Sequence, residues 1–245
     1  MNELDKKNTS NKNENVLFLN GWMENSDTWK PIIKGFEKEF NCFTLEFPGF
    51  GVFPAPKKTW DISDYAVWVQ GEIDRLEIKE VTVVGHSFGG RVAIVLCSKD
   101  SRIKKVVLYS TPGFEEPKST KTKLLQSAIK MSDRIGVKKE RIPFSNYLSD
   151  KFRSSDYKTA GSMREIFISA INFNLSPFMK EIKIPTLLLW GENDKESSLA
   201  TANRMQSTIR NAELKIIPEA GHFAHLDNPN LFCGIIRRFI NEKNV

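Results

Sequence analysis

The chain has 245 residues and a mass of 28.0 kDa, which suits one large domain with room for an inserted subdomain. Its formal net charge of +6 comes from residues 114–184, which contain fourteen Lys and Arg and eight Asp and Glu. The rest of the chain has no net charge. These basic residues form no runs interleaved with aromatic side chains, so we exclude a nucleic-acid groove. No apolar run approaches the roughly 18 residues that span a bilayer, so we expect no membrane span.

Three cysteines, Cys42, Cys97 and Cys233, each lie among apolar residues. They cannot all form disulfides with one another. Their apolar neighbours are typical of cysteines buried in the core rather than of a disulfide framework or a metal site. We therefore expect a reducing, cytoplasmic setting. Residues 1–15 are rich in Asn and Lys and contain no apolar segment of the kind that a signal peptide needs, which predicts a disordered polar tail.

Short apolar runs rich in β-formers alternate with longer segments at helical spacing, which predicts an α/β fold with a mostly parallel sheet and crossover helices. We expect six strands, all central or nearly central in the sheet, at residues 16–20, 42–47, 81–85, 105–109, 186–190 and 214–217. Helices are expected at residues 61–78, capped by Asp61 or Ser63, at residues 91–99, and at about residues 229–241.

Residues 112–183 interrupt this alternation. A long stretch of helical pattern, basic charge and scattered aromatic residues stands where a single crossover helix is expected. The expected organisation is a core formed by residues 16–111 and 184–245, with residues 112–183 inserted as a helical lid.

The third expected strand ends in Gly85-His86-Ser87-Phe88-Gly89, and a helical run follows at once. This is the pattern G-x-S-x-G in the strand-turn-helix setting that presents a nucleophilic serine. The flanking glycines relieve the crowding of so sharp a reversal, and the amino terminus of the helix favours negative charge beside the hydroxyl. A chance match in a Gly-rich turn is the alternative, but it leaves the flanking strand and helix unexplained. We predict Ser87 as the nucleophile.

A serine hydroxyl needs a base within hydrogen-bond reach, and the chain contains three histidines. His86 adjoins Ser87 on a tight turn where neighbouring side chains point apart, so we expect it to pack beside the turn. His222 and His225 lie between the last strand and the last helix, at the same edge of the sheet as Ser87. His222 is the predicted base because Gly221 frees its backbone, whereas His225 is expected to cap the following helix or to face solvent.

The third member of such a site is a carboxylate that accepts a hydrogen bond from the imidazole and fixes its tautomer. The fifth expected strand runs directly into Gly191-Glu192-Asn193-Asp194. We predict Asp194 as this acid, with Glu192 and Asp227 as the alternatives. The order serine, acid, histidine along the chain, each on a loop that follows its own strand, supports this choice.

The oxyanion of a tetrahedral intermediate needs two hydrogen-bond donors. One is the backbone amide of Phe88, directly after Ser87. The second is expected in the loop after the first strand, where Asn20-Gly21-Trp22 places a flexible glycine before Trp22. We predict the amide of Trp22 as this donor, with the Trp22 ring beside the acyl group of the substrate.

These motifs resemble those of the α/β-hydrolase superfamily. The similarity extends from residue 16 to the C-terminus apart from the lid, and the matching segments are residues 20–22, 47–51, 85–90, 190–194 and 221–222. The position of the insert is similar to that in small carboxylesterases and in pimeloyl-acyl-carrier methyl ester esterase, and carbon–carbon bond hydrolases of aromatic catabolism look similar too. The resemblance implies a lidded α/β-hydrolase fold that needs no metal and no cofactor.

The chain also departs from the usual pattern of this family. Asn20 stands where the family usually has His, which leaves the backbone donor intact. Glu46 replaces the Asp common at the end of the second strand, and Val52 and Phe53 follow Gly51 in place of a Ser or Thr, which makes the pocket rim more apolar. The two N-terminal antiparallel strands of many members are not evident, so we expect a shortened sheet.

The expected activity is hydrolysis of a carboxylic ester of a small molecule through a Ser-His-Asp triad and an acyl-enzyme intermediate. A carbon–carbon bond (diketone) hydrolase, and a ligand-binding or interaction protein with the hydrolase fold and weak catalysis, are the alternatives. Substrate contacts are expected from Trp22, Phe144, Tyr147 and Phe223, although aromatic residues of the insert also suit an ordinary lid core. The basic surface of the insert either docks an acidic partner such as an acyl carrier protein or is a solvated charged face. Its members are Arg134, Lys138, Lys139, Arg141, Lys151 and Arg153.

Overall fold

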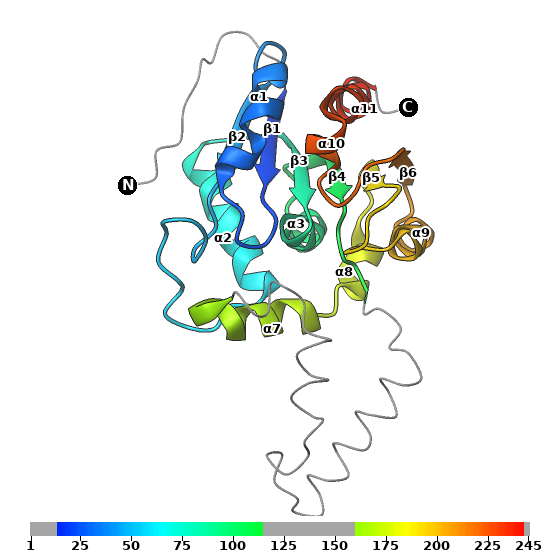
Figure 1. Ribbon diagram of the computed structural model, residues 1–245. Helices are drawn as coiled ribbons and strands as arrows, with labels where there is room; N and C mark the ends of the chain where they lie inside the picture. The colour runs from blue at the N-terminus through cyan, green and yellow to red at the C-terminus, as the bar shows by residue number, and fades with distance from the viewer. Residues whose placement is uncertain (1–13, 115–159, 243–245) are drawn as a thin grey trace, which may run out of the picture.

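A six-stranded parallel sheet forms the centre of the computed structural model (Figure 1), which describes residues 14–114 and 160–242. The strand order is β2-β1-β3-β4-β5-β6, and every neighbouring pair is parallel. The prediction of an α/β fold on a parallel sheet of about six strands is confirmed, and each predicted strand overlaps an observed one. The strands are β1 (Asn15–Leu19), β2 (Asn41–Leu45), β3 (Val81–His86), β4 (Ile103–Tyr109), β5 (Thr186–Gly191) and β6 (Ala212–Ile217).

The outer strands differ from the prediction that all six are central or nearly so, because β2 and β6 form the edges of the sheet. In β6 the side chains of Glu213 and Lys215 are exposed, and Ile216 is 46% exposed. Charged residues along an outer strand protect a sheet from pairing with other chains. The prediction was wrong for β6 because it began the strand after Glu213 and so left out half of this charged alternation.

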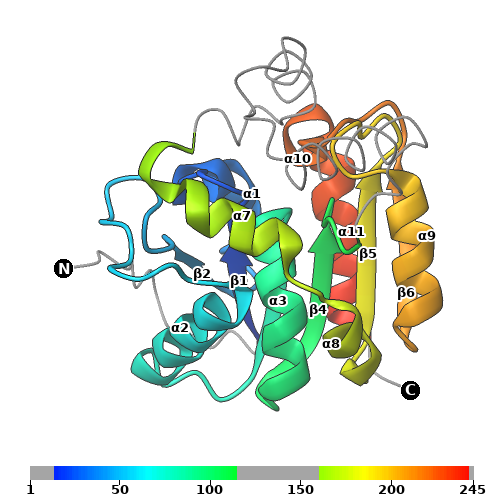
Figure 2. The ribbon, with the colours of Figure 1, turned by 90° about the horizontal axis from the view of Figure 1, so that it is seen from below.

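Helices cover both faces of the sheet (Figure 2), as buried parallel strands require. One face carries α2 (Ile62–Arg75), α3 (Phe88–Lys99), α8 (Ser176–Glu181) and α9 (Leu199–Thr208), and the other carries α1 (Lys30–Phe36) and α11 (Pro229–Asn241). The remaining elements of the described ranges are α7 (Arg164–Asn172), α10 (Ala224–Asp227) and the 3-10 turns η1 (Ser26–Trp29) and η3 (Gly161–Met163). Helices α2, α3 and α11 overlap the predicted ones, whereas α1 and α9 were not predicted.

The start of α2 settles which residue caps it. Oδ1 of Asp61 accepts the N–H groups of Ser63 at 2.7 Å and Asp64 at 3.1 Å. Oδ2 of Asp64 accepts the N–H of Asp61 at 2.9 Å, which completes a capping box. Asp61 is therefore the cap, and Ser63 lies within the first turn. The helix ends earlier than predicted, and Glu77 follows it with a φ of 56°.

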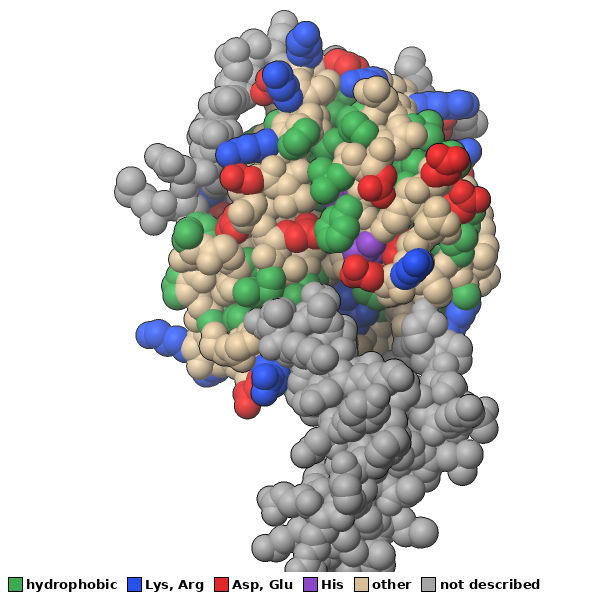
Figure 3. Space-filling view, viewed as in Figure 1, with side chains coloured by type: hydrophobic (Ala, Val, Ile, Leu, Met, Phe, Trp, Pro, Cys, Tyr) green, Lys and Arg blue, Asp and Glu red, His purple; other side chains and the backbone are tan. Residues whose placement is uncertain are grey.

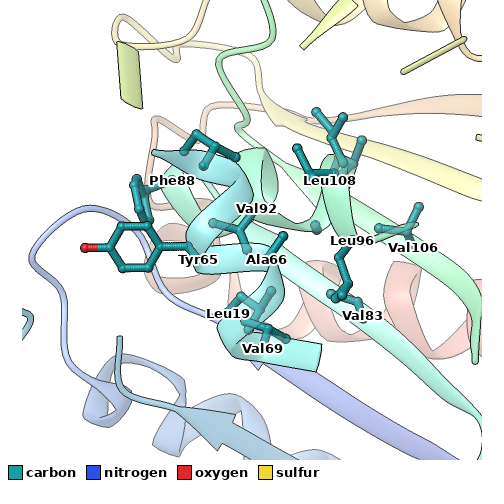
Figure 4. Packing of buried hydrophobic residues seen from close by; sticks show 14 of the residues in the cluster. Leu19, Tyr65, Ala66, Val69, Val83, Phe88, Val92, Leu96, Val106 and Leu108 are labelled. Atoms are coloured by element: carbon teal, nitrogen blue, oxygen red, sulfur yellow. The ribbon is translucent and has the colours of Figure 1, made fainter. Parts of the chain in front are cut away.

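Two apolar clusters, one on each side of the sheet, form the core. Helix α3 belongs to the first cluster, in which its residues Val92 and Leu96 pack together with Val83 of β3 and Leu108 of β4 (Figure 4). Every residue of α3 from 88 to 96 is buried. This burial fixes the helix on the sheet and, with it, the turn that joins β3 to α3.

The strand order creates a crevice at one edge of the sheet. From β1 the chain passes to β2 on one side, and β3 lies on the other side of β1. The connections that leave the carboxyl ends of β1 and β3 therefore diverge, and such a switch point is the usual ligand site of an open α/β sheet. The loop after β1 carries Gly21 and Trp22, and the turn after β3 carries Ser87.

The predicted tail and lid fall partly outside the described residues, which leave out 1–13 and 115–159. Residues 160–183 contain η3, α7 and α8, and this end of the insert is tied to the core. The Arg91 guanidinium of α3 donates to the carbonyl oxygens of Ala170 at 2.7 Å and Phe173 at 3.1 Å. The ring of Phe167 in α7 lies 4.9 Å from the ring of Trp22. Helix α7 therefore lies beside the loop that follows β1.

Cys42, Cys97 and Cys233 are all free, as expected for cysteines outside a disulfide framework, and each is partly buried. Among the helices of the described ranges, none is long and apolar enough to cross a membrane.

Candidate active site

Ser87 lies at the turn between β3 and α3 in a backbone conformation that side chains rarely adopt. Its φ is 47° and its ψ is −108°. Such a residue costs about 1–3 kcal/mol and persists only where its surroundings hold it. Here the N–H of Ser87 donates to the carbonyl of Tyr109 at the end of β4, at 2.9 Å. This strained turn presents a half-buried Ser87 at the carboxyl edge of the sheet.

The glycines on either side of Ser87 are required because other backbone comes very close. A Cβ atom on Gly85 would lie 2.7 Å from the carbonyl oxygen of Gly89, and a Cβ on Gly89 would lie 2.4 Å from that of Leu19. The N–H of Gly89 donates to the carbonyl of Asn20 at 2.9 Å. The G-x-S-x-G spacing therefore follows from packing, and the serine turn is joined directly to the loop after β1.

Asp194 and His222 lie on the loops after β5 and β6, and their side chains are bonded to each other. Nδ1 of His222 is 3.0 Å from Oδ1 and 2.9 Å from Oδ2 of Asp194, and both residues are buried. Oδ1 of Asp194 also accepts the N–H groups of Glu196 and Ser197, each at 2.9 Å, which fixes the carboxylate. The structure thus brings together the residues predicted as acid and base.

Burial and pairing act in opposite directions on the two groups. Burial alone would raise the pKa of Asp194, but the hydrogen bonds from His222 and from the N–H of Ser197 outweigh it, so this pKa lies below its ordinary value. Burial alone would lower the pKa of His222, but the hydrogen bond to Asp194 and its negative charge outweigh it, so this pKa lies above its ordinary value. With Nδ1 donating to a carboxylate, Nε2 is the basic nitrogen of the neutral ring.

Glu192 and Asp227, the alternatives for the acid, brace the loop of His222 instead. Glu192 accepts the N–H of Glu219 at 2.9 Å, and Asp227 accepts the N–H of Gly221 at 2.7 Å. Both bonds hold the backbone just before the imidazole. The geometry therefore favours Asp194 as the acid, whereas Glu192 and Asp227 stabilise the backbone of the loop.

His225 is buried, so the prediction that it caps the last helix or faces solvent was wrong. It is 1% exposed, and its Nδ1 lies 3.1 Å from the hydroxyl of Tyr109. Burial, followed by the positive charge of His86, lowers the pKa of His225 to about 4, so the ring is neutral near pH 7. The side chain that caps α11 is that of Asn228, which accepts the N–H of Leu231. The short helix α10 turns His225 inward, and sequence reasoning did not foresee that helix.

His86 packs beside the serine turn as predicted, and it contacts a carboxylate that sequence reasoning missed. Its ring is fully buried, and Nδ1 lies 3.1 and 3.3 Å from the two carboxylate oxygens of Glu24. Glu24 also accepts the N–H of Gly21 at 3.0 Å. Burial would raise the pKa of Glu24, but the charge and hydrogen bond of His86 and the Gly21 N–H lower it below its ordinary value. Nε2 of His86 lies 3.2 Å from the carbonyl oxygen of His222.

The two amides predicted to form the oxyanion hole lie on adjoining segments. Phe88 is the first residue of α3, Trp22 follows β1, and their rings are 5.4 Å apart. Within residues 14–114 and 160–242, neither amide donates to a protein acceptor. The two amides thus lie on neighbouring segments at the switch point of the sheet.

A sequence profile of the alpha/beta hydrolase fold matches residues 14–136 and 138–229. The chain belongs to the α/β-hydrolase family. This hydrolase is 28% identical to the pimeloyl-[acyl-carrier protein] methyl ester esterase of Wigglesworthia glossinidia brevipalpis, over 94% of this chain and 95% of that protein. It is 25% identical to 2-hydroxy-6-oxononadienedioate/2-hydroxy-6-oxononatrienedioate hydrolase 1 of Pseudomonas putida, over 94% and 88%. The crystal structure of the enol-lactonase from Burkholderia xenovorans LB400 matches with a TM-score of 0.73 and 21% identity, over 98% and 95%. The predicted family is confirmed, and the names of these relatives cover more than one reaction.

A second carboxylate of the hydrolase approaches the imidazole of His222 from solvent. Oε2 of Glu196 is 3.7 Å from Nε2 of His222, and the Glu196 side chain is 61% exposed. Its charge adds to that of Asp194 in raising the pKa of His222. Sequence reasoning passed over Glu196, although an acidic residue two positions after the predicted acid was a visible signal.

The predicted substrate-contacting residues are only partly within the described ranges. Figure 3 shows histidine surface of the hydrolase reaching solvent beside apolar and acidic side chains. Phe223 is 38% exposed, and its ring lies 5.4 Å from that of His222. The half-buried ring of Trp22 lies against other aromatic rings near the serine turn. Phe144 and Tyr147 lie outside the described residues.

Two cavities of the described part of the hydrolase lie away from this site. One of about 740 Å³ is at the amino end of the sheet, between the starts of β1, β3 and β4 and the end of α11. The other, of about 370 Å³, lies between the segment after β4 and the connection of α7 to α8. Neither is lined by Ser87, Asp194 or His222, so neither is by itself the pocket of the predicted chemistry.

Proposed function

We propose that this hydrolase cleaves carboxylic esters through a triad of Ser87, His222 and Asp194 and an acyl-enzyme intermediate. The observation that carries the proposal is the buried pair of Asp194 and His222, 2.9 Å apart, on the sheet edge where a strained turn holds Ser87. In this scheme Nε2 of His222 takes the hydroxyl proton as Oγ of Ser87 attacks the ester carbonyl. The charge of Asp194 then stabilises the imidazolium through Nδ1–H.

The rest of the scheme uses backbone donors and water. The oxyanion of the tetrahedral intermediate accepts hydrogen bonds from the N–H groups of Trp22 and Phe88. His222 gives its proton to the departing alkoxide, and the alcohol leaves. Water, deprotonated by His222, then attacks the acyl group on Ser87, and the acid is released when Oγ regains its proton. Apart from water and the ester, all the groups in this scheme belong to the protein, so the scheme needs no metal and no cofactor.

The aromatic surroundings support an ester with an apolar acyl group. The ring of Trp22 lies 5.1 Å from Phe50, 5.4 Å from Phe88 and 4.9 Å from Phe167. The name of the Wigglesworthia relative describes an ester whose acyl group is attached to a carrier protein. We include docking of an acyl carrier to the basic insert in the proposal. Turnover of carrier-linked esters would then fall with added salt more steeply than turnover of free esters.

Labelling by a fluorophosphonate probe and hydrolysis of p-nitrophenyl esters of graded chain length test the proposal. The wild-type chain should be labelled and should hydrolyse at least one ester, and Ser87→Ala should lose both properties. Ser207→Ala, which removes an exposed hydroxyl from α9, is the matched control and should behave as wild type. Full ester hydrolysis by Ser87→Ala would disprove the assignment.

The second candidate is a carbon–carbon bond hydrolase, because the Pseudomonas putida relative is named as the hydrolase of an oxo-diacid. A vinylogous diketone offered beside the ester panel separates the two reactions. Faster turnover of the diketone than of any ester would replace the ester proposal while keeping the same triad. A chain that binds ligands but neither reacts with the probe nor turns over either substrate would be a hydrolase-fold binding protein.

A further inference from the structure

A buried chain of polar contacts runs behind the predicted triad. The N–H of Gly21 donates to Glu24 at 3.0 Å, and the carboxylate of Glu24 meets Nδ1 of His86 at 3.1 Å. Nε2 of His86 meets the carbonyl oxygen of His222 at 3.2 Å. The chain therefore connects the loop that carries the Trp22 amide to the backbone of the predicted base.

The acceptors around His86 determine where its protons lie. A carbonyl oxygen accepts hydrogen bonds and cannot donate them, so the contact with His222 is a hydrogen bond only when Nε2 carries a hydrogen. An ionised carboxylate also only accepts, so the contact with Glu24 requires a hydrogen on Nδ1 as well. Both contacts together require the doubly protonated ring.

The other titratable groups around the ring do not compete with Glu24 for this proton. Tyr109 stacks on His86 at a centroid distance of 4.5 Å, and its own hydroxyl donates to the carbonyl of His222 at 2.7 Å. The rings of His222 and His225 lie at 4.9 and 5.8 Å. Glu24 is the anionic group in contact with His86 in the described part of the chain, and its side chain is 16% exposed.

We propose that Glu24 holds His86 as an imidazolium, and that this pair is a positioning device joining the oxyanion loop to the catalytic histidine. Hydrogen bonds that involve an ionised donor are shorter and roughly twice as strong as neutral ones. The charged ring of His86 therefore holds the carbonyl of His222 more firmly than a neutral ring does. The charge state stands independently of the proposed function, whereas the effect on turnover rests on it.

The charge state is measured by nuclear magnetic resonance of the 15N-labelled protein. The chain has three histidines, so three imidazole spin systems have to be assigned, and single His→Gln variants assign them. We expect both ring nitrogens of His86 to carry hydrogens at pH 7. In Glu24→Gln, whose amide oxygen still accepts the Gly21 N–H, one of them should lose its hydrogen. An unprotonated ring nitrogen on His86 in the wild-type protein at pH 7 would overturn the proposal without any variant.

The positioning role is measured by steady-state kinetics on the best ester of the panel. Glu24→Gln should lower kcat about tenfold, because small displacements of reacting groups are costly, and should change KM by less than about twofold. Glu46→Gln is the matched control, since Glu46 accepts the N–H of Ser26 in the same loop at 3.0 Å. It should leave kcat and the His86 spectrum unchanged.

The outcomes separate this proposal from the proposed function. Equal losses of kcat in Glu24→Gln and Glu46→Gln would show a general effect of the loop and would overturn the positioning role. A wild-type chain that hydrolyses no ester or diketone would refute the proposed function, and the imidazole spectrum would still decide the charge of His86.

Discussion

Replacing Asp194 with Asn changes the charge beside the imidazole while leaving the local fold in place. Oδ1 of Asp194 accepts the N–H groups of Glu196 and Ser197, each at 2.9 Å, so the amide oxygen of Asn takes that position. The amide NH2 then occupies the position of Oδ2, 2.9 Å from Nδ1 of His222. A donor at this place favours the tautomer that carries the ring hydrogen on Nε2, which is the nitrogen that has to accept the proton of Ser87.

The expected loss follows from this change of tautomer and from the lost charge. In other serine triads, the corresponding change lowers kcat about 10⁴-fold. We expect a fall of about 10³- to 10⁴-fold here, which corresponds to about 4–5.5 kcal/mol of transition-state stabilisation at 1.36 kcal/mol for each factor of ten. Without Asp194, His222 loses the largest of the contributions that raise its pKa, so its pKa moves down.

The assay is the pH dependence of kcat/KM for a short p-nitrophenyl ester. The reaction needs neutral His222, whose pKa lies above the ordinary 6.5, so the wild-type rate should rise with pH through a midpoint above 6.5. Asp227→Asn is the control, because the amide oxygen still accepts the Gly221 N–H, and its rate should stay within about threefold of wild type. Retention of more than about a tenth of the wild-type kcat by Asp194→Asn would refute the reasoning.

Three further predictions test other parts of the site, and the last of them includes a control variant. Glu196→Gln should move the midpoint of the pH profile to lower pH, because a negative charge 3.7 Å from Nε2 of His222 is removed, and added salt should reduce the difference between the two proteins. Ser87→Gly should be inactive yet more stable to urea than Ser87→Ala by about 1 kcal/mol, because Gly adopts a φ of 47° without strain; equal stabilities would contradict strain at this turn. Gly89→Ala should unfold at much lower urea concentration than wild type, by about 2 kcal/mol or more, since its Cβ meets backbone at 2.4 Å. Gly71→Ala, which meets nothing within 4 Å in α2, should instead be slightly stabilised, by up to about 1 kcal/mol.

The parts of the fold that carry strong local signals were predictable. β3 and α3 are continuous apolar runs on either side of a glycine-flanked serine, and the structure places them within a few residues of the prediction. Asp194 and His222 were predictable because parallel strands bring the loops that follow them to one edge of the sheet. Their 2.9 Å contact agrees with that reasoning. The G-x-S-x-G pattern and the common edge of parallel strands were together sufficient to predict the positions of these residues.

The contacts that the sequence did not reveal join residues without a motif across long separations. Glu24 and His86 are 62 residues apart, and nothing in the segment around Glu24 distinguishes it from any polar loop. The inward position of His225 depends on a helix of only four residues. Helix α1 is seven residues long and begins with Lys30 and Pro31, so its periodicity is too short to be recognised. In each case tertiary packing, rather than local preference, decides the structure.

The acidic residues around His222 have two effects that have to be balanced. Loops are mobile unless their backbone groups are held, and Glu192 and Asp227 hold this loop by accepting the N–H groups before the imidazole. Asp194, Glu196 and Glu24 place negative charge around the base, and this charge raises the pH at which His222 becomes neutral and able to accept a proton. Glu24 is also the carboxylate that contacts His86, whose Nε2 lies 3.2 Å from the carbonyl oxygen of His222. In the proposed scheme one acidic residue therefore acts on both the charge and the backbone position of the base.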